Sequence, residues 1–264
     1  GVMDADEMAK APIHAIGSGP SMAPIAGRHY ARADAASDTA IVADTGGTTF
    51  DISLVRRDVI PTTPETWLGQ RYRGHIVGFP SVDVKSIGAG GGSIARVDEG
   101  GLLHVGLASA GAVPGPACYG KGGRRSTVTD AALVLGYIDP AFFLGGTMTL
   151  EAGPAAEAIE RDVAAPLGLG LPEAASAILR LATENMVSAI EEITINQGID
   201  PRGAVLVGGG GAAGLNSVAI ARRLGCKTLL IPEVGAALSA AGALMSELRA
   251  DHRALYYSAT DNFD

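Results

Sequence analysis

The segment from Ile41 to Val55 constrains the fold of this chain more than any other part of the sequence. An apolar run ends at Asp44, two glycines and two threonines follow, and a second run then alternates apolar and polar residues. Such a pattern predicts two strands joined by a tight turn. Because glycine allows a sharp backbone reversal and close approach to a ligand, the segment predicts a β-hairpin whose tip is able to bind one.

The tip of this hairpin has the residue types that bind a nucleotide phosphate. Successive backbone N–H groups in a glycine turn can form an anion-binding nest, and threonine hydroxyls add donors. The four residues that we predict to hold phosphate are Gly46, Gly47, Thr48 and Thr49. Asp44 and Asp51 would repel phosphate directly, so we expect both to bind Mg2+ (or Mn2+), which prefers carboxylate and phosphate oxygens. A bare Asp-x-Gly-Gly also occurs in ordinary hairpins, but the full Asp-x-Gly-Gly-Thr-x-x-Asp favours nucleotide binding.

The composition indicates a folded protein and excludes some classes of partner. With 264 residues and 47% hydrophobic content, the chain can bury one large core or two small ones. Its 37 glycines and 18% charged residues indicate many tight turns rather than disorder. The net charge of -8, without a cluster of Lys or Arg, argues against a nucleic-acid surface.

The cysteines and the apolar runs bear on the compartment. Cys118 and Cys226 lack metal-ligand spacing and suit a reducing cytoplasm. We recognise no signal peptide and no apolar run long enough to span a bilayer, so we expect a cytoplasmic protein without a membrane partner. The opening residues Gly1-Val2-Met3-Asp4 are unlike a natural start, which suggests a piece of a longer chain.

A second glycine run follows the strongest helical pattern of the chain. Apolar residues recur at helical spacing over residues 173–197, and Gly198 stands where a C-cap glycine belongs. A short buried strand at 204–207, a glycine turn and a helix at 212–224 come next. The glycines of this turn are Gly208, Gly209, Gly210 and Gly211. Alone they are explained equally well by tight strand–helix packing, but together with the first hairpin they predict the adenosine side of one nucleotide cleft.

A third candidate segment covers residues 82–93. Asp83 and Lys85 alternate with valines, so we expect both side chains on one strand face, either as a solvent-facing pair or as part of a substrate site. The glycines from Gly88 to Gly92 predict either a phosphate or substrate nest, or a strand that crosses close to another element. Further on, Thr129-Asp130 is predicted to cap a short helix over 131–136, with Asp130 accepting backbone N–H bonds.

Six segments of the chain resemble the ATP-dependent hydantoinase/oxoprolinase family, which includes N-methylhydantoinase, 5-oxoprolinase and the ketone (acetone/acetophenone) carboxylases. The most specific is the block Ser-Ala-Gly-Ala-Val-Pro-Gly-Pro-Ala-Cys-Tyr-Gly at 109–120. The others are Ser18-Gly19-Pro20, the hairpin tip at 44–51, the glycine run at 88–95, Thr127-Val128-Thr129-Asp130-Ala131, and Gln197-Gly198-Ile199-Asp200-Pro201. The hairpin tip by itself is also similar to the phosphate loop of the actin, sugar-kinase and heat-shock chaperone superfamily.

The resemblance implies a fold and a reaction. It implies the second half of an actin-like or sugar-kinase-like α/β ATPase, with a mixed sheet flanked by helices and a glycine-rich β insertion. In that arrangement residues 1–56 begin the ATPase lobe, 57–130 form the insertion on the substrate side, and 131–264 contain the helices and the adenosine side. ATP with Mg2+ would phosphorylate a small carbonyl or amide substrate. Asp44 and Asp51 would organise the metal and the attacking group, while Asp83, the Gly90 loop and Asp130 would face the substrate.

Two departures from the family pattern keep other functions open. The first Gly-Thr-Asp-type phosphate loop is missing, so the other half of the cleft would come from an N-terminal part or from other subunits of a hetero-oligomer. Lys85 stands where many members have histidine, which favours the ketone-carboxylase branch over the hydrolases. A nucleotide-dependent chaperone or reactivating factor, and a non-catalytic half-domain that docks a partner subunit, are the alternatives.

Overall fold

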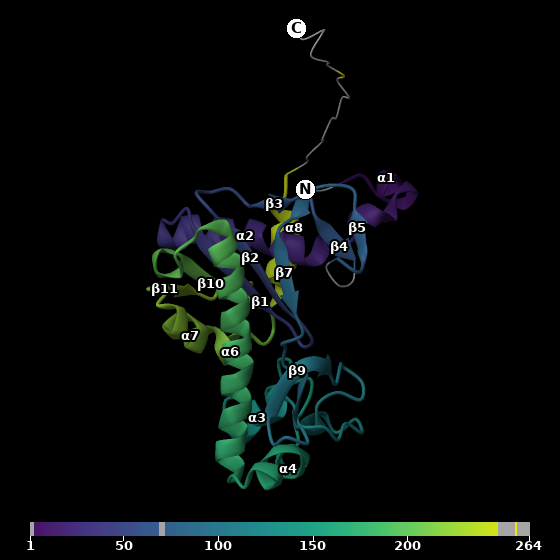
Figure 1. Ribbon diagram of the computed structural model, residues 1–264, viewed down its shortest axis with the longest axis vertical. Helices are drawn as coiled ribbons and strands as arrows, with labels where there is room; N and C mark the ends of the chain where they lie inside the picture. The colour runs from purple at the N-terminus through teal and green to yellow at the C-terminus, as the bar shows by residue number, and fades with distance from the viewer. Residues whose placement is uncertain (1–2, 69–71, 248–256, 258–264) are drawn as a thin grey trace.

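The computed structural model describes residues 3–68, 72–247 and 257, and it is built on a five-stranded mixed sheet (Figure 1). The strand order is β11-β10-β1-β2-β7. The strands are β1 Ala40–Thr45, β2 Phe50–Val55, β7 Val84–Ile87, β10 Val205–Gly209 and β11 Thr228–Leu230. β10 is parallel to both β1 and β11, whereas β2 is antiparallel to β1 and β7. The central strands are buried apolar runs, as a sheet covered on both faces requires.

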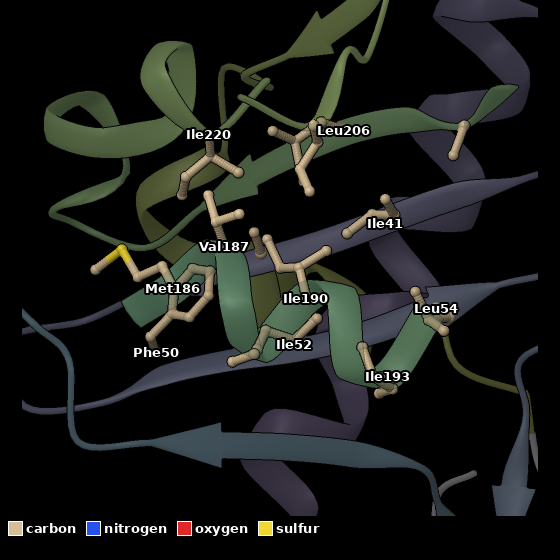
Figure 2. Close-up of a cluster of buried hydrophobic side chains, with 14 of the residues drawn as sticks. Ile41, Phe50, Ile52, Leu54, Met186, Val187, Ile190, Ile193, Leu206 and Ile220 are labelled. Atoms are coloured by element: carbon tan, nitrogen blue, oxygen red, sulfur yellow. The ribbon is translucent and has the colours of Figure 1, made fainter. Parts of the chain in front are cut away.

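Helices cover both faces of this sheet. The long helix α6 (Leu171–Gln197) and α7 (Ala213–Leu224) lie on one face, and α2 (Ser18–Ala35) and α8 (Leu238–Leu244) lie on the other. Because side chains alternate along a strand, Ile41 packs toward α6, while its neighbour Val42 packs toward α2 and α8. Figure 2 shows the first of these two cores, where Ile190 and Val187 of α6 lie against side chains of β1, β2 and β10.

The N-terminal half of α6 extends beyond the sheet and carries a second, smaller body (Figure 1). Its elements are β8 Ser93–Val97, β9 Leu103–Ser109, α3 Val128–Val134, α4 Ala152–Ile159, a π-helical turn at Glu160–Ala164 and α5 Ala165–Leu167. Ile159, Val163 and Ile178 are fully buried at its centre. One helix therefore belongs to both cores and ties the two bodies together.

The remaining elements are short. They are α1 Ala5–Lys10, the strand pair β3 Thr62–Thr63 with β6 Ser81–Val82, the strand pair β4 Thr66–Leu68 with β5 His75–Val77, and 3-10 turns at Pro12–Ala15, Ala117–Tyr119, Pro201–Gly203 and Gly235–Ala237. No helix among the described residues is long and apolar enough to cross a membrane.

The predicted mixed sheet flanked by helices is confirmed, as are the 40–56 hairpin, the helix ending at Gly198 and the strand–glycine–helix unit after it. The predicted insertion at 57–130 is divided in the structure, since β7 is an edge strand of the central sheet and β8 and β9 belong to the second body. The small-residue segment at 236–249 predicts a last helix, but α8 covers only Leu238–Leu244, and residues 248–249 lie outside the described part.

Candidate functional site

The predicted phosphate hairpin closes at its tip by one backbone hydrogen bond, from the N–H of Gly46 to the carbonyl of Thr49 at 2.9 Å. In the described part of the chain, the N–H groups of Gly47, Thr48 and Thr49 donate to no protein acceptor. All three residues are exposed. Consecutive free N–H groups at an exposed turn form a concave donor surface that suits an anion.

The carbonyl groups of the same turn are held from behind by the 88–92 glycine run. The N–H of Gly91 donates to the carbonyl of Gly46 at 3.1 Å, and the N–H of Gly92 donates to that of Gly47 at 2.6 Å. A Cβ on Gly90 would lie 2.7 Å from backbone atoms of the hairpin, so only glycine fits there. Of the two readings of this run, the close crossing is the one that the structure shows. It fixes the carbonyls of the turn and leaves its N–H groups free.

The two predicted metal ligands, Asp44 and Asp51, stand directly opposite each other in the β1–β2 register. Burial raises the pKa of the Asp44 carboxyl, and the charge of Asp51 adds to the rise, while the Ser239 hydrogen bond opposes it. Within the described residues no Lys, Arg or His forms an ion pair with either aspartate, and two adjacent carboxylates of this kind fit a divalent cation. Among the described residues no group of three or more His, Cys, Asp or Glu side chains could hold a metal. An ion at this pair would therefore take its other ligands from phosphate and water.

The second glycine run lies against this hairpin. Gly208 and Gly209 end β10, where tight packing against α7 and α8 leaves no room for a side chain. Gly210 has a φ of +85°, and a Cβ there would lie 2.2 Å from the carbonyl oxygen of Thr45 and 2.5 Å from Oδ1 of Asp44. Gly211, in contrast, has open space around it. The structure thus brings both predicted glycine segments to one place.

The predicted substrate-side residues near β7 are engaged with α6. Asp83 lies just before β7, not on it, and its Oδ2 accepts a hydrogen bond from Nε2 of Gln197 at 2.6 Å. Lys85 forms an ion pair with Glu192. The charge of Lys85 is therefore compensated by a residue of α6. The position of Lys85 gives no support to the prediction that it favours the ketone-carboxylase branch. A substrate-facing role for Asp83 stays a prediction.

Asp130 has a structural role in the fold, whereas the sequence predicted that it faces the substrate. It is fully buried, and its carboxylate accepts N–H donors from Ala117 at 3.2 Å, Cys118 at 2.7 Å and Thr127 at 2.9 Å, and the Thr127 hydroxyl at 2.7 Å. The N-cap of α3 is Thr127, in a capping box with Asp130 as its N3 partner, so the predicted cap was placed wrongly. Burial, together with the Asp130 charge, raises the pKa of the Cys118 thiol, which disfavours the reactive thiolate.

Two serines that contact the predicted metal ligands were missed in the sequence analysis. Ser86 donates a hydrogen bond to Oδ1 of Asp51, and Ser239 donates to Oδ2 of Asp44 at 3.0 Å. Each comes from an element that the fold brings to the hairpin from a distance. A serine on a strand and one on a small-residue helix give no signal in the sequence, because only the register of β7 and the packing of α8 place them.

The mixed sheet flanked by helices, with the hairpin turn at the end of β1 and the glycine turn beside it, defines an actin-like α/β fold. Residues 1–252 match the family model described as hydantoinase/oxoprolinase, and the chain belongs to this family.

Relatives of known name support this assignment. The chain is 43% identical over 244 residues to the caprolactamase subunit alpha of Pseudomonas jessenii. This alignment covers 92% of the chain and 34% of the relative. It is 38% identical over 209 residues to the acetophenone carboxylase gamma subunit of Aromatoleum aromaticum, covering 77% of the chain and 28% of the relative. The chain thus spans about a third of the length of these relatives.

Two solved structures share the fold. Nucleotide-free acetone carboxylase aligns with a TM-score of 0.77 and 27% identity, over 85% of this chain and 31% of that one. ATP-dependent caprolactamase from Pseudomonas jessenii aligns with a TM-score of 0.76 and 42% identity, over 84% of this chain and 31% of that one. Each alignment covers at least 84% of this chain.

Proposed function

We propose that this chain forms one wall of an ATP–Mg2+ site in an enzyme that activates a small carbonyl or amide substrate by phosphorylation. The observation that carries this proposal is the hairpin tip, where the free N–H groups of Gly47, Thr48 and Thr49 lie beside the carboxylates of Asp44 and Asp51. The described ATP dependence of the related caprolactamase and acetone carboxylase supports it.

Each part of the hairpin has a task in this proposal. The free N–H groups of the tip and the Thr48 hydroxyl would bind phosphate oxygens, and the two aspartates would hold Mg2+ against them. A bound ATP would supply the γ-phosphoryl group, whose transfer to the substrate oxygen would release ADP and turn that oxygen into a leaving group. The fixed N–H donors of the turn would stabilise the charge on the phosphoryl group without reorganising, since the 88–92 run already holds the turn in place.

Other parts of the active protein complete the site in this proposal. The relatives are about three times longer than this chain, and two of them are named as subunits. The second wall of the cleft would come from further sequence of the same protein, from a partner subunit, or from both. Free thiols at Cys118 and Cys226 suit a cytoplasmic location.

We propose a cyclic amide as the substrate class. The caprolactamase subunit shares 43% identity over 92% of the chain, and its name denotes an activity on a lactam. A ketone is the second candidate, because the acetophenone carboxylase subunit shares 38% identity over 77% of the chain. In both cases the reacting oxygen belongs to a carbonyl group, so the phosphorylation step is the same.

Calorimetric titration of the full-length protein with Mg–ATP tests the proposal. Asp44→Asn should abolish or strongly weaken binding, whereas Asp34→Asn, an exposed aspartate on α2, should leave it unchanged. ATP hydrolysis measured with ε-caprolactam, 5-oxoproline, or acetophenone plus bicarbonate then identifies the substrate class. Equal binding by wild type and Asp44→Asn would overturn the phosphate-site assignment, and no substrate-stimulated ATP loss in the complete enzyme would overturn the reaction.

A further inference from the structure

Two serines from distant parts of the chain reach the paired carboxylates of the hairpin. Ser239 lies on α8 and Ser86 on β7, and neither element is next to the hairpin in the sequence. Each serine donates its hydroxyl hydrogen to one aspartate. A lysine or an arginine in the same place would cancel the negative charge of the carboxylates. Since a hydroxyl is neutral, the serines orient the carboxylates and leave that charge in place.

Ser239 determines which oxygen of Asp44 is available. Its hydroxyl holds Oδ2 at 3.0 Å, and no hydrogen bond to Oδ1 occurs among the described residues. Oδ1 lies next to Gly210, where even a Cβ would come within 2.5 Å of it. Oδ1 of Asp44, the oxygen without a hydrogen bond among the described residues, therefore faces the glycine turn. It fits there because Gly210 has no side chain.

Ser86 fixes Asp51 through the sheet itself. The two residues are direct partners in the β2–β7 register, and Ser86 donates to Oδ1. On the other side, Oγ1 of Thr49 donates to Oδ2 at 3.2 Å, which links the carboxylate to the tip of the hairpin. The edge strand is in turn anchored on α6 by the ion pair between Lys85 and Glu192. The orientation of Asp51 thus depends on where β7 lies.

We propose that Ser86 and Ser239 are positioning residues that set the Asp51 and Asp44 carboxylates in the orientation that binds the nucleotide-associated divalent cation. The inference rests on the proposed function and adds two residues outside the hairpin to its site. Hydrogen-bond partners of metal-ligating groups commonly change metal affinity about 10- to 100-fold when they are removed. Loss of either serine hydroxyl should therefore weaken cation binding without removing the phosphate donors of the tip.

The test measures Mn2+ binding to the full-length protein by electron paramagnetic resonance in the presence of ADP, which gives a readout independent of turnover. Ser86→Ala and Ser239→Ala should each raise the half-saturating Mn2+ concentration about tenfold or more, and Ser86→Thr, which keeps the hydroxyl, should restore binding. The matched controls are Ser53→Ala, on the same strand face as Asp51, and Ser188→Ala, exposed on α6. Neither control side chain donates to the two aspartates in the described part of the chain.

Two further variants separate the possible outcomes. Asp44→Asn and Asp51→Asn should lose Mn2+ binding if the proposed function is right. If they do, while both serine variants bind like Ser53→Ala and Ser188→Ala, the positioning role is refuted and the proposed function stands. If both asparagine variants bind Mn2+ like the wild type, the metal site itself is refuted, and the positioning role with it.

Discussion

Gly210 offers the sharpest test of how the two glycine runs meet, because its neighbour Gly211 is a matched control. The substitution Gly210→Ala places a Cβ 2.2 Å from the carbonyl oxygen of Thr45 and 2.5 Å from Oδ1 of Asp44. It also requires a residue with a side chain to keep a φ of +85°. At Gly211 neither problem exists, since its φ is not positive and nothing lies within 4 Å of a Cβ there.

The magnitude follows from these two effects. A left-handed backbone costs a residue with a Cβ about 1–2 kcal/mol, and forced overpacking costs about 1–3 kcal/mol. The smaller conformational entropy of unfolded alanine returns about 0.4–1 kcal/mol. We therefore expect Gly210→Ala to lower the free energy of unfolding by about 2–4 kcal/mol, and Gly211→Ala to change it by less than about 0.5 kcal/mol.

Urea unfolding of the full-length variants, followed by circular dichroism, measures both values. Gly210→Ala should shift the midpoint strongly to lower urea, with an unchanged slope. The Gly211→Ala curve should superimpose on that of the wild type. If the two variants unfold at the same urea concentration, the close contact between the glycine turn and the end of β1 is not present in solution, and the two glycine runs do not form one site.

Two other substitutions and one labelling experiment follow from the contacts and burial described above. Asp130→Asn replaces a carboxylate oxygen that accepts hydrogen bonds by an NH2 group that donates them, in a place surrounded by four buried donors. It should lower the free energy of unfolding, measured in urea, by about 1–3 kcal/mol; unchanged stability would refute the structural role of Asp130. Asp44→Asn, in a chelating buffer, should raise the melting temperature at neutral pH, because the pKa of Asp44 is raised by burial and its ionised form is disfavoured. The gain should disappear as pH falls through that pKa, where wild-type Asp44 is protonated in the fold; a gain that grows toward acid would contradict the assignment. Iodoacetamide should label half-buried Cys226 before buried Cys118 in the native protein, by mass spectrometry.

The sequence was sufficient for the parts of the fold that are coded locally. The hairpin at 40–56 follows from alternation and a glycine turn, and helix α6 follows from its apolar spacing and from Gly198, which takes the left-handed C-cap conformation. Each of these signals lies within a few residues of the structure it determines. The same is true of the N-cap of α3, since Thr127 and Asp130 have the spacing of a capping box, which would have identified the right cap.

What the sequence could not give depends on long-range packing. The place of β7 at the edge of the central sheet rests on its pairing with β2, and the glycine-rich stretch around it gave no reason to separate it from β8 and β9. The partners of the two aspartates depend on that pairing and on the packing of α8 behind the sheet. The burial of Asp130 likewise results from the 116–119 loop folding over α3.

Gly47 shows how the demands of the fold and of a ligand can be separated. Its φ is not positive, and a Cβ on it would meet no atom within 4 Å, so the protein itself does not require glycine there. Gly90, in contrast, is required by the hairpin backbone 2.7 Å away. Under the proposed function, close approach of a phosphate would use the bare backbone at Gly47.

The expected result of Gly47→Ala is therefore unchanged stability together with weaker Mg–ATP binding, since the new methyl group occupies the surface where phosphate oxygens would contact the free N–H groups. Gly203→Ala is the matched control, because a Cβ on Gly203 also meets no atom within 4 Å. Gly203 precedes the first residue of β10, whereas the glycine turn beside the hairpin follows the last residue of that strand. Urea unfolding and calorimetry on the same protein samples give both quantities. Full Mg–ATP affinity in Gly47→Ala would mean that the nucleotide does not reach the tip of the hairpin.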